Sequence, residues 1–233
     1  MKKFLTNNKI YFETLAMVLL GVMSVIVTCN SNRIATQQTE LSKSSIQPRF
    51  GMNIYPANYD TTRMYFKDTN LDLYCYEGSY ENLTTSTITF LNVNYEKLGE
   101  WKSFEIPLNG YFLNNFKGET KLGLVRMLRC YENLRELNDF EAFVSSILRE
   151  NKMGALFTTQ CYLTLNYLDI ENVEHTKYYD VSFREGILIG EDEGMRKFLD
   201  HSNALKEGRL FSTYRLREEQ EKLKEHIRTK ILH

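Results

Sequence analysis

The sequence LAMVLLGVMSVIVTC, Leu15–Cys29, contains no charged residue, and the rest of the chain is organised around it. A helix needs about 20 mostly apolar residues to cross the hydrocarbon core of a bilayer. Extending the run back to Ile10 reaches that length and includes one carboxylate, Glu13, near the helix start, where it complements the helix dipole. We therefore expect a transmembrane helix over residues 10–29, after an N-terminal tail over residues 1–9.

Two other interpretations of this segment stay open. Lys2 and Lys3 followed by an apolar core are also typical of a cleaved signal peptide, although residues 26–28 depart from the small-x-small cleavage pattern. The sequence IVTC resembles a lipobox in which Cys29 would be acylated, with Thr28 in place of the usual small residue. We adopt the uncut signal-anchor, and all three interpretations place the chain at a membrane or beyond it.

Charge and cysteine usage favour opposite orientations of this anchor. Lysine and arginine are slightly denser before the apolar run than after it, which favours an N-terminus in the cytoplasm. Beyond the anchor the sequence has an odd number of cysteines without framework spacing, namely Cys75, Cys130 and Cys161. Such usage favours a reducing compartment for the remainder. The side of the membrane on which the main domain lies therefore stays open.

Residues 30–48 are polar and tolerate a helix, so we expect the membrane helix to continue into a stalk. Ile34 and Leu41 lie seven residues apart, a spacing that also allows two helices to pair. Pro48 should end the stalk, because the residue before a proline is disfavoured in the helical conformation.

Composition after the stalk is typical of a folded domain. The chain has fifteen tyrosines and fourteen phenylalanines but only three prolines, which argues against disorder. Its net charge is −1, so there is no electrostatic basis for binding nucleic acid. The expected partners are the lipid bilayer and either another protein or a second copy of the chain.

Alternating apolar residues predict short strands over most of residues 49–205. The expected strands cover residues 50–55, 63–66, 71–77, 84–95, 101–108, 156–169 and 177–183. Short alternating segments separated by turn residues are typical of an antiparallel β-sandwich or barrel. We therefore predict an α+β protein in which an antiparallel β-sandwich-like domain follows the anchor and stalk.

Two helical regions interrupt or follow these strands. The first is an insertion at about 122–152, in which DFEAFVSSILREN carries an apolar stripe with a period near 3.6 residues. A surface helix is expected near residues 190–208. The charged segment 206–233 should form a C-terminal helix, either packed through a narrow apolar stripe or paired with another chain; the stripe contains Leu216, Leu223, Ile227 and Ile231.

Two segments of the chain are similar to a group of bacterial proteins. SNRIATQQTELSKSSIQPRF, Ser31–Phe50, resembles the stalk of uncharacterised bacterial single-pass membrane proteins, in which a β-rich domain follows. LTLNYLDIENVEHTKYYDVSF, Leu163–Phe183, resembles one of their hairpins, with Glu171–Val173 in place of a glycine-rich turn. The resemblance implies an anchored domain without known enzymatic activity, and some such proteins resemble accessory parts of phage-defence loci.

The sequence contains none of the common catalytic motifs. It has no phosphate loop, no G-x-G-x-x-G, no G-x-S-x-G and no H-E-x-x-H, and it has no C-x-x-C pair for a structural zinc. We therefore name no catalytic residue, metal ligand or cofactor. Two weaker candidates remain: an acidic cluster of Asp169, Glu171, Glu174 and His175, and an aromatic interaction surface of Tyr74, Tyr76 and Tyr80.

These observations favour a membrane-anchored, non-catalytic binding module whose ligand the sequence does not identify. One alternative is a sensor or effector whose paired membrane helices perturb the bilayer, possibly in phage defence. Another alternative is a membrane-tethered hydrolase that would use the acidic cluster with a divalent metal ion.

Overall fold

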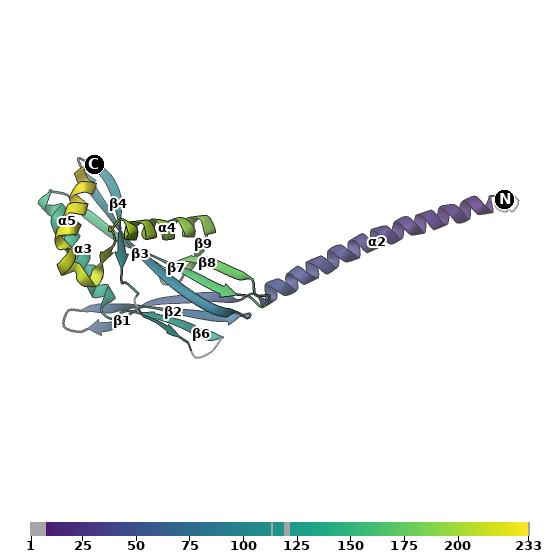
Figure 1. Ribbon diagram of the computed structural model, residues 1–233, viewed down its shortest axis with the longest axis horizontal. Coiled ribbons are helices and arrows are strands. Elements are labelled where there is room, and N and C mark those ends of the chain that lie inside the picture. The colour runs from purple at the N-terminus through teal and green to yellow at the C-terminus, as the bar shows by residue number, and fades with distance from the viewer. Residues whose placement is uncertain (1–7, 113, 119–121, 233) are drawn as a thin grey trace. The chain divides into compact units, whose positions relative to one another are not determined.

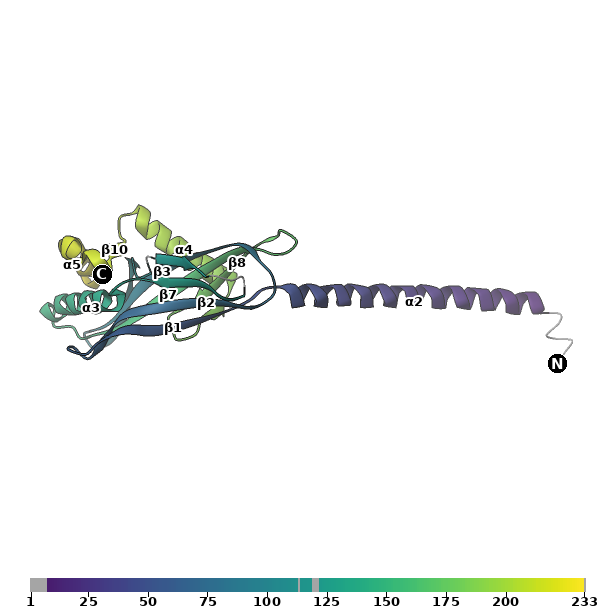
Figure 2. The same cartoon turned by 90° about the horizontal axis from the view of Figure 1, so that it is seen from below.

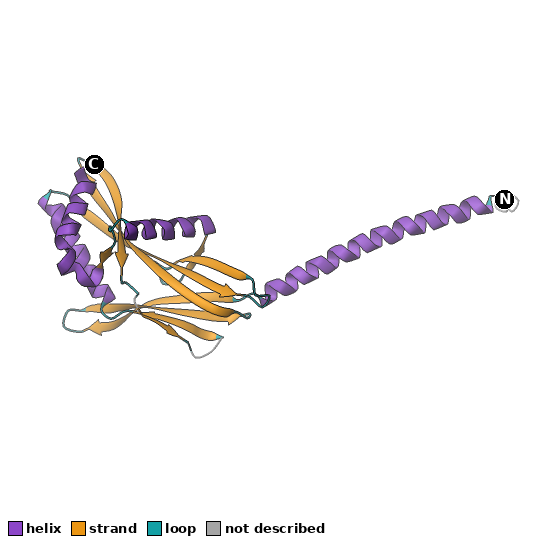
Figure 3. Cartoon of the chain, in the orientation of Figure 1, coloured by secondary structure: helices purple, strands orange, loops and turns teal. Residues whose placement is uncertain are grey.

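The chain divides into two compact units, Met1–Gln47 and Pro48–His233. The computed structural model describes residues 8–112, 114–118 and 122–232 (Figure 1). Within these residues the protein is α+β, with four α-helices and two β-sheets (Figure 3). The N-terminal unit consists of one long helix, and the second unit contains every strand.

Helix α2, Lys9–Ile46, joins the expected membrane helix and the expected stalk without a break. Its section Glu13–Glu40 is long and apolar enough to cross a bilayer, and the chain buries none of it. The helix ends just before Pro48, as the conformational restriction on the residue preceding a proline predicts.

The second unit is built on two sheets, which Figure 2 shows from another side. The four-stranded sheet has the order β1-β2-β6-β5, with β1 Arg49–Asp60, β2 Tyr65–Glu77, β5 Asn114–Lys117 and β6 Gly123–Arg129. The six-stranded sheet has the order β10-β4-β3-β7-β8-β9, with β3 Glu81–Lys97, β4 Glu100–Asn109, β7 Ala155–Leu168, β8 Glu174–Asp180, β9 Ile187–Ile189 and β10 Phe211–Ser212. Neighbouring strands are antiparallel except for the short parallel pair of β10 and β4.

One hydrophobic cluster receives side chains from both sheets. Leu71 and Leu73 of β2 project into it from the four-stranded sheet, and Leu91, Leu163 and Leu165 project into it from β3 and β7. All five are fully buried. Their spacing of two residues along each strand is the alternation that predicted these strands from the sequence.

Helices cover the rest of the domain. Helix α4, Glu191–Lys206, packs through Phe198 on a smaller cluster at the other face of the six-stranded sheet, where Ile88, Phe90 and Tyr162 lie. Helices α3, Asn133–Glu150, and α5, Leu216–Leu232, lie side by side at one end of the sheets (Figure 1).

The apolar stripes predicted for α3 and α5 are confirmed as buried faces. In α3 the buried side chains include Phe140, Val144 and Ile147, which follow the helical period. In α5, Leu223 and Ile227 are fully buried in the domain's own core. The α5 stripe is therefore packed within the chain and is not available for pairing with another chain.

The helical insertion predicted at about 122–152 is wrong in its first part, because Gly123–Arg129 is strand β6 and α3 begins only at Asn133. A β-bulge explains the error: consecutive residues Leu73 and Tyr74 of β2 pair with Arg126 and Leu124, which leaves Val125 as an extra residue. The bulge turns both Val125 and Leu128 into the core. Buried residues three apart then imitate the spacing of a helix.

The C-terminal helix also begins later than predicted. Residues 206–215 complete α4 and then form β10 and a short 3₁₀ helix, η1 Thr213–Arg215, before α5 starts at Leu216. Gly208 has φ +67°, a left-handed conformation that side chains disfavour, and it separates α4 from β10.

Candidate functional site

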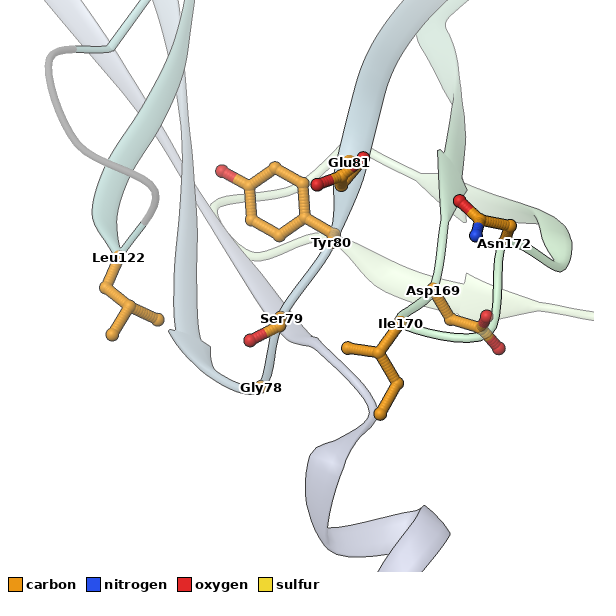
Figure 4. Close-up of a pocket in the computed structure, with 8 residues that line it drawn as sticks. All are labelled: Gly78, Ser79, Tyr80, Glu81, Leu122, Asp169, Ile170 and Asn172. Carbon is orange, nitrogen blue, oxygen red and sulfur yellow. The ribbon is translucent and has the colours of Figure 1, made fainter.

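A pocket lies where three chain connections meet at one end of the two sheets (Figure 4). Its volume is about 530 Å³. The lining comes from the β2–β3 connection, the start of β6 and the β7–β8 loop, and comprises Gly78, Ser79, Tyr80, Glu81, Leu122, Asp169, Ile170 and Asn172. We call this cavity the hairpin-end pocket. It brings together Tyr80 and Asp169, which belong to the two different candidates predicted from the sequence.

The Asp169 carboxylate organises the β7–β8 loop. Its Oδ1 accepts hydrogen bonds from the backbone N–H groups of Glu171, at 2.8 Å, and Val173, at 3.0 Å. Its Oδ2 lies 2.8 Å from Nε2 of His175. The hydrogen bond to His175 is the main cause that lowers the pKa of Asp169 below its usual value. The pair therefore fixes the loop in one conformation.

Aromatic side chains support this pair from the core side. The His175 ring stacks on Tyr167 with ring centroids 5.2 Å apart, and Phe50 contacts both Tyr167 and Tyr80 at 5.3 and 5.4 Å. Burial raises the pKa of Tyr167 and of Tyr80, so both hydroxyls stay neutral at physiological pH. The wall of the pocket is thus rigid and apolar behind a polar rim.

The predicted acidic cluster is only partly assembled. Asp169 and His175 are in contact, whereas Glu171 and Glu174 are exposed on the loop and at the start of β8. Among the described residues, no group of three or more His, Cys, Asp or Glu side chains is arranged to hold a metal ion. The geometry favours a structural role for the Asp169–His175 pair.

A second surface is the outer face of the four-stranded sheet, opposite the core. Tyr74 and Tyr76 alternate with the buried Cys75 on β2, so both project to this face. Their rings lie almost parallel, at 5°, with centroids 6.1 Å apart, and the Tyr76 side chain is 64% exposed. A side chain at Gly51 of the neighbouring strand would collide with the Tyr76 ring, so glycine makes room for it.

Polar groups continue this face beside the two tyrosines. Arg129 of β6 forms an ion pair with Asp72 of β2, and it donates to the Tyr55 hydroxyl of β1 at 3.2 Å. Tyr55 in turn donates to the Asp72 carboxylate at 3.1 Å. We call the surface formed by Tyr55, Asp72, Tyr74, Tyr76 and Arg129 the outer aromatic face. It joins the three strands β1, β2 and β6 across their exposed side.

The predicted surface of three tyrosines is therefore divided between two places. Tyr74 and Tyr76 lie on the outer aromatic face, whereas Tyr80 is only 8% exposed and lines the hairpin-end pocket. Sequence reasoning missed Tyr55 and Arg129 as members of the face. Tyr55 lay within a predicted strand and could have been found from alternation, but Arg129 was assigned to a helix.

Comparison of the chain with protein-family models, with curated proteins and with solved structures finds no match. The functional argument for this protein is accordingly built on the geometry of its own residues.

Proposed function

We propose that this protein is a single-pass membrane protein that presents a non-catalytic binding domain. In this proposal α2 crosses the bilayer, and residues 48–233 form a β-sandwich that contacts a protein partner. The observation that carries the proposal is the outer aromatic face, because tyrosine and arginine are enriched where proteins bind one another and charged side chains there are already paired.

Three further observations support this function. The domain builds its core from its own residues, so it is a folded unit that an anchor can present. The exposed Tyr76 ring rests over Gly51 and beside Tyr74, so binding would cost little conformational entropy. The apolar section of α2 has no partner within the chain, which also favours contact with lipid and with a second copy of α2.

Site-specific photocrosslinking in cells tests the partner. A photoreactive phenylalanine analogue at Tyr76 of the full-length protein should capture a defined partner, and the same analogue at Trp101 should not. Trp101 is the matched control because it is similarly exposed, at 60%, but lies on β4 of the other sheet. Equal products from both positions, or none from Tyr76, would contradict the proposal.

Membrane attachment has a separate test. The full-length protein should stay in the membrane fraction after a carbonate wash, and a fragment of residues 48–233 should remain in the supernatant. Recovery of the intact full-length chain from the supernatant would reject the anchor without bearing on the partner surface.

A further inference from the structure

A second cavity lies between the start of α3 and the start of α5, at the end of the domain where these helices pack side by side (Figure 1). Its volume is about 480 Å³, within the range of pockets that hold small molecules. It is lined by residues 135–139 of α3 and residues 213–220 of η1 and α5. We call it the helix-start pocket.

Unpartnered polar atoms are concentrated in this pocket. Among the described residues, five buried side-chain nitrogen or oxygen atoms have no hydrogen-bond partner, and three of them belong to residues that line it. They are Oγ1 of Thr213, Nε of Arg135 and Oε2 of Glu136. Thr213 is only 2% exposed, so its hydroxyl is removed from bulk water without compensation. A buried polar group without a partner destabilises a fold unless a ligand or bound water supplies one.

The three atoms ask for complementary chemistry. The guanidinium Nε–H of Arg135 donates, the carboxylate of Glu136 accepts, and the Thr213 hydroxyl can do either. Burial is the main cause that raises the pKa of Glu136, as expected for a carboxyl that lacks a hydrogen-bond donor. A ligand that satisfies all three must therefore both donate and accept within one small volume.

The charges of the lining balance, which excludes a strong preference for an ion. Arg135, Arg215 and Arg217 face three carboxylates, those of Glu136, Asp139 and Glu218. A net anion or cation would be repelled by one set as strongly as it is attracted by the other. A neutral ligand gains hydrogen bonds from both sets. The Tyr214 ring, with the Arg215 guanidinium 5.4 Å from its centroid, adds a flat surface to the lining.

We propose that the helix-start pocket binds a sugar through adjacent hydroxyl groups. Each hydroxyl can accept from a guanidinium and donate to a carboxylate, and the C–H face of a sugar ring can pack on Tyr214. This inference rests on the proposed binding function and gives it a ligand class, while the outer aromatic face keeps the protein partner.

Saturation-transfer NMR on the full-length protein in lipid nanodiscs tests the proposal. The probes are D-glucose, D-galactose, D-mannose and N-acetyl-D-glucosamine, with glycine as a zwitterion and inorganic phosphate as a competing anion. We expect saturation of at least one sugar that phosphate does not displace. Saturation of glycine alone, displacement of the sugar by phosphate, or no saturation of any sugar would overturn the proposal.

Two valine variants separate binding from folding. Thr213→Val removes the unpartnered hydroxyl at constant shape, so it should leave the melting temperature unchanged or higher and weaken sugar binding at least fivefold. Thr164→Val is the control, because the buried Thr164 hydroxyl is already bonded to the Ser86 carbonyl at 3.4 Å. It should lower the melting temperature and keep the sugar signal. Sugar binding that survives Thr213→Val, or a loss of stability equal to that of the control, would overturn the assignment.

The result is independent of the partner surface. Failure of sugar binding with intact crosslinking from Tyr76 would reject only the helix-start pocket. Loss of crosslinking with intact, Thr213-dependent sugar binding would reject only the protein partner.

Discussion

The Asp72 carboxylate and the Arg129 guanidinium form an ion pair that joins β2 to β6 on the outer side of the four-stranded sheet. Arg129 also donates to the backbone carbonyls of Leu71 and Leu128, each at 3.0 Å. One side chain thus holds two strands through both charge and backbone contacts. Because Asp72 is buried, the pair is shielded from water more than an ordinary surface ion pair.

Removing the charge of Asp72 should destabilise the domain. Asp72→Asn leaves Arg129 without its counter-ion, and we expect a loss of about 2 kcal/mol in the free energy of unfolding. Glu77→Gln is the control on the same strand, because its pair with Arg49 at 3.3 Å is exposed and should contribute less than about 1 kcal/mol. Urea unfolding of residues 48–233 measures both, and equal losses would contradict the prediction.

Two leucines of β7 should differ in their contribution to the core. Leu163→Ala removes a fully buried side chain from the cluster shared by both sheets, and we expect a cost of about 2–5 kcal/mol. Leu156→Ala changes a side chain that is 62% exposed on the same strand, so the change should stay within about 0.5 kcal/mol. Thermal unfolding would show a large decrease only for the first variant. Similar values for both would contradict the core described above.

The Asp169–His175 contact should make part of the stability depend on pH. The pKa of Asp169 is lowered in the folded state, so its contribution is fully present above the pKa of a free aspartate, about 3.9, and is lost as the pH falls through the lower folded value. Wild type and Asp169→Asn should therefore differ at pH 7 and converge at pH 2. Urea unfolding at several pH values checks this. A difference that grew toward low pH would have the wrong sign.

The three thiols of the folded domain should be unreactive until it unfolds. Cys75, Cys130 and Cys161 are all buried and unpaired in disulfides, and burial raises the pKa of Cys161 to about 12. A maleimide should label none of them in native residues 48–233 at pH 7 and all three in 6 M guanidinium chloride. Mass spectrometry counts the labels, and fast native labelling of any thiol would contradict its burial.

A charge in the middle of the apolar run should prevent membrane insertion. Val22→Arg places a guanidinium at the centre of the spanning section, which costs about 2.5–3.5 kcal/mol on insertion scales. Asn32→Arg makes the same change in the polar part of α2 and should have no effect on attachment. Carbonate extraction of the full-length protein compares the two variants, and equal retention would contradict the placement of the span.

Most strands could be predicted from the sequence because inward and outward side chains alternate along them. In β2, Leu71, Leu73 and Cys75 are buried at every second position, as expected. Strand β6 could not be predicted in this way, since its bulge replaces the alternation locally. A bulge depends on pairing with β2, which lies some fifty residues earlier and leaves no local signal.

The candidate sites divide along the same line. Asp169 and His175 lie six residues apart on one hairpin, so their proximity could be predicted from the local sequence. The contact of Asp72 with Arg129, and of Arg135 with the segment that contains Thr213, depends on tertiary packing. Hydrophobic periodicity reports which face of an element is buried but does not report what lies against it.

The burial of Leu223, Ile227 and Ile231 in the shared core has a consequence for biosynthesis. A ribosome releases the chain from its N-terminal end, so α2 and most strands emerge before these three side chains exist. The nascent domain must wait with part of its interior uncovered until α5 is translated. Chaperones thus have a defined interval in which to bind it, and a ribosome that stalls before residue 223 would release an incompletely closed product.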